Sequence, residues 1–352
     1  MELRIYNAEM QFLGLIENQT SVLWNRKYFE PGDFEIFCPV TPNNQRLLQR
    51  GNLVWIRGAA EAGVIEWLII EQDDLRNQIN AKGRFLSAYM NRRLIRPTYN
   101  IQNGLVETAM RDLLSNAVPL PLVELGPVQG FTETVSFQAT YKNVLDYEMK
   151  LAKYANIGFR FRPDFSDKKI TFELFKGLDR TFAQTDRARV VFSAEYNNLL
   201  SAKYTLNDQL LKTVCYVGGQ GEGSERTYAI AGDDSLAGLE RREVFLNASD
   251  ISKEGLTDAQ YIAALTQRGN NELQKDALAE SVECVTDANS NFVYGRDYDI
   301  GDIVVIRKEE WDLLINLRIT ELTEIYEYGA MKVSPVFGNP LPSAIDWSER
   351  DG

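Results

Sequence analysis

Hydrophobic and polar residues alternate along much of the chain, and a period of two is the pattern of half-buried β-strands. The pattern is clearest near the C-terminus, where residues on one face are Leu313, Ile315, Leu317 and Ile319, and those on the other are Asn316, Arg318 and Thr320. The β-branched run 303–306 predicts an antiparallel partner strand. Gly301 at its entry can take backbone angles closed to other residues, and Asp299 and Asp302 can bond local amides there.

Residues 1–96 predict a small barrel of four or five short strands joined by hairpins. The runs 22–28 and 34–37 flank Pro31 and Gly32. Pro31 suits the first turn position and Gly32 the second, where φ is positive, so the sequence predicts a type II turn. Further strands are expected at 53–57, 67–71 and 79–86, with a short helical turn at 43–48.

From residue 97 the apolar spacing becomes that of helices. A first helix has one apolar face between Leu105 and Ala117 and ends before Pro119. Thr140 is expected to cap a second helix that stops before Gly158. A hairpin of 158–162 with 169–175 follows, so 97–185 is predicted to be an α+β unit.

Strands resume at 190–193, 199–207 and 212–217, followed by a glycine-rich excursion that we expect to be flexible as far as Gly238. A helical stretch of about 249–280 then contains the capping-box pattern Thr257 to Gln260. Strands at 281–286 and 332–336 complete the pattern. The whole chain is therefore predicted to be β-rich α+β.

Composition narrows the function classes. At 352 residues the chain has room for two or three domains, and its formal charge of −12 argues against duplex DNA as the main ligand. No apolar run approaches a membrane span, and the N-terminus lacks the features of a signal peptide, so synthesis in a cytoplasm is expected. There is no histidine, which excludes Ser-His-Asp and Cys-His catalysis and His-ligated zinc.

Candidate chemistry is sparse. Cys38, Cys215 and Cys284 have no metal-binding spacing and are expected to be reduced and buried. Asp297, Asp299 and Asp302 lack the remaining positions of a calcium loop, so strand-entry capping is favoured. The run 218–224 lacks the Gly-Lys-Ser/Thr ending of a phosphate loop. We expect no enzyme activity, cofactor or metal.

A basic stretch lies between residues 76 and 96, which contain no acidic residue. Such a patch can dock on an acidic surface of a neighbour or a phosphate backbone. A solvated edge strand guarded by charge explains it equally well. The candidate contact residues are Arg76, Lys82, Arg84, Arg92, Arg93 and Arg96.

Taken in order, several short motifs make the chain resemble the tail hub (tail-associated or baseplate hub) proteins of tailed bacteriophages, most of all the siphophage branch. The resemblance covers nearly the whole chain to about residue 342. The motifs span 24–36, 247–251, 268–273, 297–304, 318–322 and 335–338, and their key residues are Trp24, Pro31, Gly32, Asp299, Gly301, Asp302 and Gly338.

The resemblance implies two tail-tube-like β-barrel domains with an accessory α/β domain. These are 1–96, 97–185 and 186–342, the last with a helical insertion of about 249–280, and 343–352 is a tail. Strands between 190 and 217 are assigned to the second barrel. The resemblance further implies a homotrimeric ring at the virion tail tip or baseplate, which adapts the hexameric tube to the three-fold tip.

The implied partners are a tail tube or distal tail protein and tip spike or fibre proteins, with DNA and tape-measure protein passing through the channel. No membrane insertion is expected. Contractile phages, bacteriocins and injection particles use the same kind of part, and the sequence does not separate them. Two other functions stay open: a glycan-binding surface or tail module, using exposed aromatic residues, and a cell-wall hydrolase that uses carboxylates alone.

Overall fold

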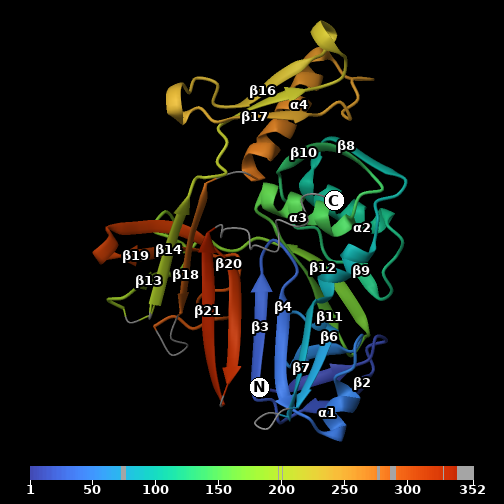
Figure 1. Cartoon of the computed structure of the whole chain (residues 1–352), viewed down its shortest axis with the longest axis vertical. Coiled ribbons are helices and arrows are strands. Elements are labelled where there is room, and N and C mark those ends of the chain that lie inside the picture. The colour runs from blue at the N-terminus through green and yellow to red at the C-terminus, as the bar shows by residue number, and fades with distance from the viewer. Residues whose placement is uncertain are drawn as a thin grey trace.

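A computed structural model describes residues 1–72, 77–196, 198–199, 201–275, 278–285, 291–327 and 329–338. Its main feature is a 13-stranded sheet that runs through both ends of the chain. An α+β unit lies beside this sheet, and a smaller unit projects beyond it at one end of the molecule (Figure 1). Among the described residues, no helix combines the length and apolarity needed to span a bilayer.

The N-terminal part of the sheet has the strand order β3-β4-β7-β6-β5-β1-β2. Its elements are β1 (Leu3–Tyr6), β2 (Phe12–Ile16), β3 (Ser21–Lys27), β4 (Asp33–Pro39), α1 (Pro42–Leu47), β5 (Leu53–Ile56), β6 (Gly63–Gln72) and β7 (Asn77–Phe85). All seven strands contribute buried side chains to one hydrophobic cluster, so this half-sheet curls around its own core. Burial alternates along β3 and β4, so every second side chain faces inward and contributes to this core.

The predicted hairpin of β3 and β4 is confirmed, but the type II turn is wrong. Gly32 does not have the positive φ that this turn requires. A Cβ at Gly32 would lie 2.2 Å from the carbonyl oxygen of Asn25 and 2.6 Å from the Phe85 ring. Glycine is needed here because backbone and ring approach too closely for a side chain, and local turn chemistry does not reveal such a contact.

The C-terminal part of the sheet has its own core. Its elements are β13 (Val191–Ser193), β14 (Ser201–Asn207), β18 (Ala279–Val285), β19 (Ile303–Lys308), η4 (Glu309–Trp311), β20 (Leu313–Glu327) and β21 (Ala330–Gly338). The predicted ribbon is confirmed, because β19 pairs antiparallel with the first half of β20. The second half of β20 pairs with β21, and the order continues to β18 and β14.

β20 also pairs with β3, and this ladder joins the two halves of the sheet. Glu321 lies opposite Lys27, and Glu327 lies opposite Ser21. Among the described residues, β2 and β14 remain at the two ends of the path, so neither half is a closed barrel. The expectation of a β-rich fold is confirmed, whereas the two expected barrels are seen here as two curled halves of one sheet.

The α+β unit beside the sheet contains η1 (Leu86–Arg92), β8 (Thr98–Leu105), α2 (Val106–Asn116), β9 (Val123–Leu125), β10 (Thr134–Thr140), α3 (Val144–Ala155), β11 (Gly158–Asp164) and β12 (Lys169–Phe175). Both predicted helices and the β11–β12 hairpin are confirmed. The cap of α3 is Asn143, whose side chain accepts from the Asp146 amide, rather than Thr140. β9 pairs parallel with β12 and was missed, because a strand of three residues has almost no periodicity.

The projecting unit, here called the inserted unit (208–275), corrects two expectations. It contains β15 (Val214–Gly218), η2 (Gly223–Glu225), β16 (Tyr228–Gly232), η3 (Gly238–Glu240), β17 (Glu243–Asn247) and α4 (Asp258–Lys275). The strand expected at 212–217 is β15, which pairs with β16 and β17 in a separate sheet, so it does not belong to the second barrel to which the sequence assigned it. The excursion to Gly238 contains β16, and the inserted part is a sheet with one helix rather than a helical insertion alone.

Candidate functional site

The motif residues from the two ends of the chain meet where β3 joins β20, and we call this region the junction. On β3 the alternation of strand side chains turns Val22, Trp24 and Arg26 inward. Trp24 is buried between Phe34 and Phe85, with ring centroids at 5.7 and 4.6 Å. Arg26 comes next on the same inward face, close to the segment that precedes β19.

Arg26 is buried and holds three partners. Its Nε donates to Glu61 Oε2 at 2.8 Å, and its Nη1 donates to Asp299 Oδ1 at 2.6 Å and to the Tyr294 hydroxyl at 2.8 Å. The Tyr294 hydroxyl donates to Glu324 Oε1 at 2.7 Å. Burial disfavours the Arg26 charge, but these neighbours raise its pKa well above the ordinary value. A buried guanidinium therefore ties both half-sheets and the segment before β19 together.

Tyr28 connects the junction to the α+β unit. A Cβ at Gly158 or at Gly301 would lie 2.4 Å from its ring, so both positions require glycine. The Tyr28 hydroxyl donates to the Asn156 carbonyl at 3.0 Å, and the Arg318 guanidinium carbon lies 5.2 Å from the ring centroid. Gly301 also has φ +90°, which confirms the backbone role expected for it.

Asp302 fixes the entry of β19. Its carboxylate accepts from the Leu178 amide at 2.7 Å, the Asp299 amide at 3.2 Å and Arg180 Nε at 3.3 Å. Burial raises the pKa of Asp302 above its ordinary value despite these bonds. Asp299 accepts from the Ile300 amide at 2.7 Å. The expected hydrogen bonds of both aspartates to local amides are confirmed. The hydrogen bond from the distant Leu178 amide to Asp302 was not predicted from the sequence.

The remaining motif residues lie further out. Gly338 ends β21 with φ +80°, and its carbonyl accepts from Thr320 Oγ1 at 2.6 Å. Pro31 lies in the connection between β3 and β4. The motif residues Trp24, Asp299, Gly301 and Asp302 thus converge on the junction, while Pro31, Gly32 and Gly338 shape adjoining chain segments. Their assignment as functional residues stays a prediction.

The basic residues do not form one open patch. Lys82 Nζ lies 2.7 Å from Glu35, and Arg84 and Arg92 lie 2.8 and 3.4 Å from Glu66. Arg93 Nε donates to the Val118 carbonyl at 2.9 Å. Arg96 is exposed and has no ion-pair partner among the described residues, and Arg76 lies outside them. Three of the six basic side chains are therefore ion-paired within the described part of the chain, and two of these three share Glu66.

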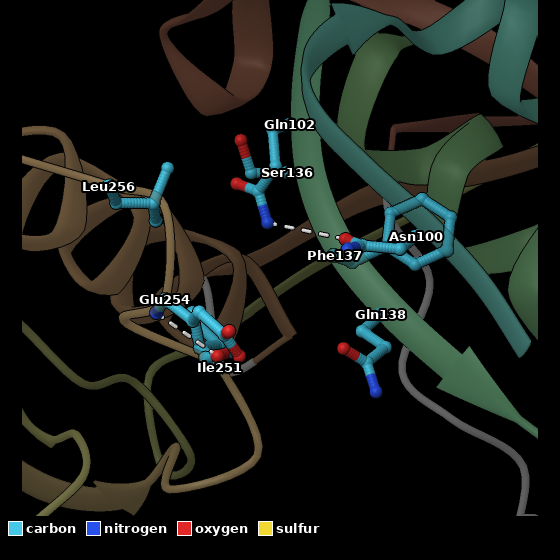
Figure 2. A pocket seen from close by; sticks show the side chains of 9 residues that line it. Asn100, Gln102, Ser136, Phe137, Gln138, Ile251, Glu254 and Leu256 are labelled. Atoms are coloured by element: carbon cyan, nitrogen blue, oxygen red, sulfur yellow. Dashed lines mark hydrogen bonds between the residues drawn. The ribbon is translucent and has the colours of Figure 1, made fainter.

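Within the described parts of the chain, no group of three or more acidic or cysteine side chains is placed to hold a metal. The three cysteines are buried, as expected, and none of them forms a disulfide within the described residues. Burial raises the pKa of Cys38 to about 11. A small cavity of about 70 Å³, lined by both polar and apolar side chains, lies between the sheet of β8 and β10 and the loop before α4 (Figure 2). It is lined by Asn100, Gln102, Ser136, Phe137, Gln138, Ile251, Ser252, Glu254 and Leu256.

Sequence reasoning missed Arg26, Tyr28 and the partners Glu61, Tyr294 and Glu324. One signal was present: the alternation of Val22, Trp24, Arg26 and Tyr28 places an arginine on an inward face. An inward arginine requires acidic partners. Nothing in the sequence indicates which acids these are, because they lie 35 and 273 residues away from Arg26.

Three solved structures that share this fold are tail proteins. The 43 kDa tail protein of prophage MuSo2 from Shewanella oneidensis is 12% identical, with a TM-score of 0.61 and coverage of 97% of this chain and 99% of that one. The tail protein from Neisseria meningitidis MC58 is 12% identical, with a TM-score of 0.62 and coverage of 96% and 95%. Prophage tail protein gp18 from Listeria monocytogenes EGD-e is 12% identical, with a TM-score of 0.61 and coverage of 99% and 98%.

A comparison with curated protein sequences finds no match. The family model for the siphovirus ReqiPepy6 Gp37-like protein, in contrast, matches residues 2–339, which include every motif and the whole junction. The chain therefore belongs to the siphovirus ReqiPepy6 Gp37-like protein family.

Proposed function

We propose that this chain is the structural hub subunit of a phage tail, and that three copies form a ring at the tail tip or baseplate. The observation that carries the proposal is the junction, where one chain joins two curled half-sheets, each with its own core, through β3 and β20. Three such chains supply six half-sheets, which matches a hexameric tube on one side and a three-fold tip on the other.

In this ring the β2 end of one copy meets the β14 end of the next, as β3 meets β20 within the chain. Such head-to-tail contacts close into a ring when the rotation is one third of a turn. Both free strands support this contact, because Phe12 on β2 and Leu206 on β14 are each more than half exposed. Exposed apolar residues on an open sheet edge favour pairing with another chain.

The role is structural and non-enzymatic in this proposal, and it needs no cofactor. The ring encloses the channel for DNA and tape-measure protein, and the formal charge of −12 suits a lumen that releases DNA. Its neighbours are a tail tube or distal tail protein and a spike or fibre protein of the tip. Arg96, which is exposed and has no ion-pair partner among the described residues, is a candidate for such a contact.

Light scattering over a range of protein and salt concentrations tests the ring. The expected mass is about 120 kDa, three times the 40.0 kDa chain. Phe12→Asp and Leu206→Asp should each lower this mass to that of the monomer, because they place a charge in the contact between copies. Leu239→Asp is the matched control, since Leu239 is 96% exposed on the inserted unit, away from both edges. A dimer, or a trimer that survives both edge variants, would contradict the arrangement.

A further inference from the structure

The sheet of the inserted unit is covered on one face only. Alternation along its strands turns Cys215, Val217 and Ala231 toward α4, where they form a core with Tyr261 and Leu265. The opposite face, here called the outer face, carries Tyr216 on β15, Tyr228 and Ile230 on β16, and Phe245 on β17. Tyr228 and Phe245 are 53% and 56% exposed. Large aromatic side chains on a rigid sheet are thus held open to solvent.

Arg226 lies across this outer face in a fixed position. Its Nε donates to the Gly219 carbonyl at 3.0 Å, and its Nη2 donates to the Gly218 carbonyl at 2.9 Å and to the side chain of Asn247. The guanidinium carbon lies 5.8 Å from the Tyr228 ring centroid and 5.6 Å from that of Phe245. A Cβ at Gly218 would lie 2.6 Å from Arg226 Nη2, so the glycine provides the slot.

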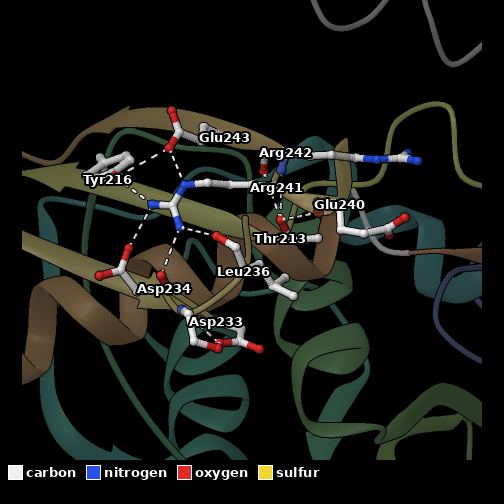
Figure 3. Close-up of polar contacts among 10 residues, drawn as sticks. Thr213, Tyr216, Asp233, Asp234, Leu236, Glu240, Arg241, Arg242 and Glu243 are labelled. Atoms are coloured by element: carbon white, nitrogen blue, oxygen red, sulfur yellow. Dashed lines mark hydrogen bonds and ion pairs between the residues drawn. The ribbon is translucent and has the colours of Figure 1, made fainter. Parts of the chain in front are cut away.

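A second arginine near this face, Arg241, uses all its hydrogen-bond donors within the chain, whereas Arg226 does not. Arg241 donates to Glu243, to the carbonyls of Asp234 and Leu236, to the Asp234 carboxylate and to the Tyr216 hydroxyl (Figure 3). These five bonds equal the five N–H donors of an arginine. Arg226 Nη1, in contrast, has no hydrogen-bond partner among the described residues, and Arg226 has no ion pair there. Arg226 therefore retains donors for a ligand.

We propose that the outer face binds a saccharide that carries a carboxylate. The acid group pairs with Arg226, which its backbone contacts hold ready. The sugar ring packs its C–H face on Tyr228 or Phe245, because aromatic faces are negative and attract polarised C–H groups. Asn247, whose Oδ1 already accepts from Arg226, and the Tyr228 hydroxyl can bond sugar hydroxyls. The face thus supplies an anion contact, a stacking surface and polar groups together.

Charge and shape favour this ligand over other anions. The inserted unit has 11 Asp and Glu against 7 Lys and Arg, so a nucleic acid or a strongly acidic peptide is repelled. One available guanidinium instead matches one carboxylate on an otherwise uncharged molecule. Peptide hot-spot side chains usually fill pockets, and the two best-defined cavities of the described residues lie away from this face. A flat sugar ring suits a flat aromatic surface.

Calorimetric titration of the full chain with matched sugars tests the proposal. Glucuronic acid and N-acetylmuramic acid should bind, while glucose and N-acetylglucosamine, which lack the carboxylate, should bind at least tenfold more weakly. Arg226→Gln should weaken binding of the acidic sugars about tenfold to hundredfold by removing a charged hydrogen bond. Tyr228→Ala and Phe245→Ala should also weaken it, and both keep the fold because these side chains are largely exposed.

The control is the arginine–aromatic pair of Arg189 and Phe182 outside the inserted unit, where the guanidinium carbon lies 5.5 Å from the ring centroid. Arg189→Gln and Phe182→Ala should leave sugar binding unchanged. Failure of the wild-type chain to bind either acidic sugar overturns the proposal, and so does binding that Arg226→Gln does not weaken. Tighter binding of a short acidic peptide such as Gly-Glu-Trp-Gly overturns it in favour of a protein partner. None of these outcomes bears on the ring, which uses other residues.

Discussion

Glu148 is an acidic residue buried in an apolar core. It lies on α3 in the core of the α+β unit and is fully buried, and neither of its carboxylate oxygens has a hydrogen-bond partner among the described residues. Burial raises its pKa well above the ordinary 4.5. The folded protein therefore holds Glu148 as a neutral acid, while the unfolded chain releases the proton above about pH 4.5. The wild-type protein loses stability as the pH rises through that value and toward the raised pKa.

Glu148→Met should stabilise the protein because it replaces an unsatisfied acid by an apolar side chain of similar length. We expect a gain of about 1–3 kcal/mol in the free energy of unfolding at pH 7.5. The gain should shrink toward pH 4.5, because the unfolded wild-type chain then also keeps the proton on Glu148 and no longer gains stability by releasing it. Urea unfolding at both pH values measures it, and Glu124→Met, at an exposed position, is the control. A gain that is equal at both pH values would argue against a neutral Glu148.

At the scale of elements, β3 and β20 are held together by side chains as well as by their ladder. Arg26 on β3 pairs with Glu61 before β6 and Asp299 before β19, and Tyr294 extends the network to Glu324 on β20. A buried ion pair of this kind adds little net stability over apolar packing, but removal of one partner leaves a buried charge. The network therefore specifies which segments meet.

Arg26→Met should cost about 3–5 kcal/mol of unfolding free energy, because Glu61 stays buried without its partner. The double variant Arg26→Met with Glu61→Met should recover much of that loss. Arg57→Met is the control, since the exposed pair of Arg57 and Glu2 should contribute less than about 1 kcal/mol. Chemical denaturation of the wild type, the two single variants and the double variant measures these losses. Equal losses for Arg26→Met and Arg57→Met would show that the junction network contributes no more to stability than a surface ion pair.

For the whole molecule, the inserted unit lies within a hairpin. Asn207, the last residue of β14, pairs with Ala279, the first residue of β18, so the chain leaves and returns at adjacent positions. The unit has its own sheet, helix and core. It also contacts the α+β unit, where Gln267 Nε2 donates to the Thr134 carbonyl at 2.9 Å.

Replacement of 208–278 by Asn-Gly should leave a folded protein, because a two-residue turn suits a hairpin whose ends already pair. We expect cooperative unfolding with a stability loss that comes from the lost contacts with the α+β unit. Circular dichroism and light scattering check the fold and the mass, and the trimer should persist. Loss of cooperative unfolding would mean that the unit is required for the rest of the chain. The variant that lacks 208–278 should also lose binding of acidic sugars.

The local periodicities of the sequence were sufficient for most elements. The alternation at 313–319 and the run 303–306 predicted the β19–β20 ribbon, and the apolar face from 105 to 117 predicted α2. Partner choice was harder, because alternation is the same whichever strand lies alongside. β15 has a strand pattern but pairs with β16 and β17 instead of β14. The sequence indicates a turn residue at Gly32, whereas the close approach of the Phe85 ring, from a residue far along the chain, explains better why this position is glycine.

The sequence by itself determined many of the strands and helices, where Gly301 must bend, and that histidine chemistry is absent. These properties depend on a residue and its near neighbours. Only the tertiary structure decided that Arg26 meets Asp299, that Tyr28 packs between Gly158 and Gly301, and that Arg226 lies between two aromatic rings. Each of these contacts depends on strand register across separate parts of the chain, and packing of the whole molecule sets that register.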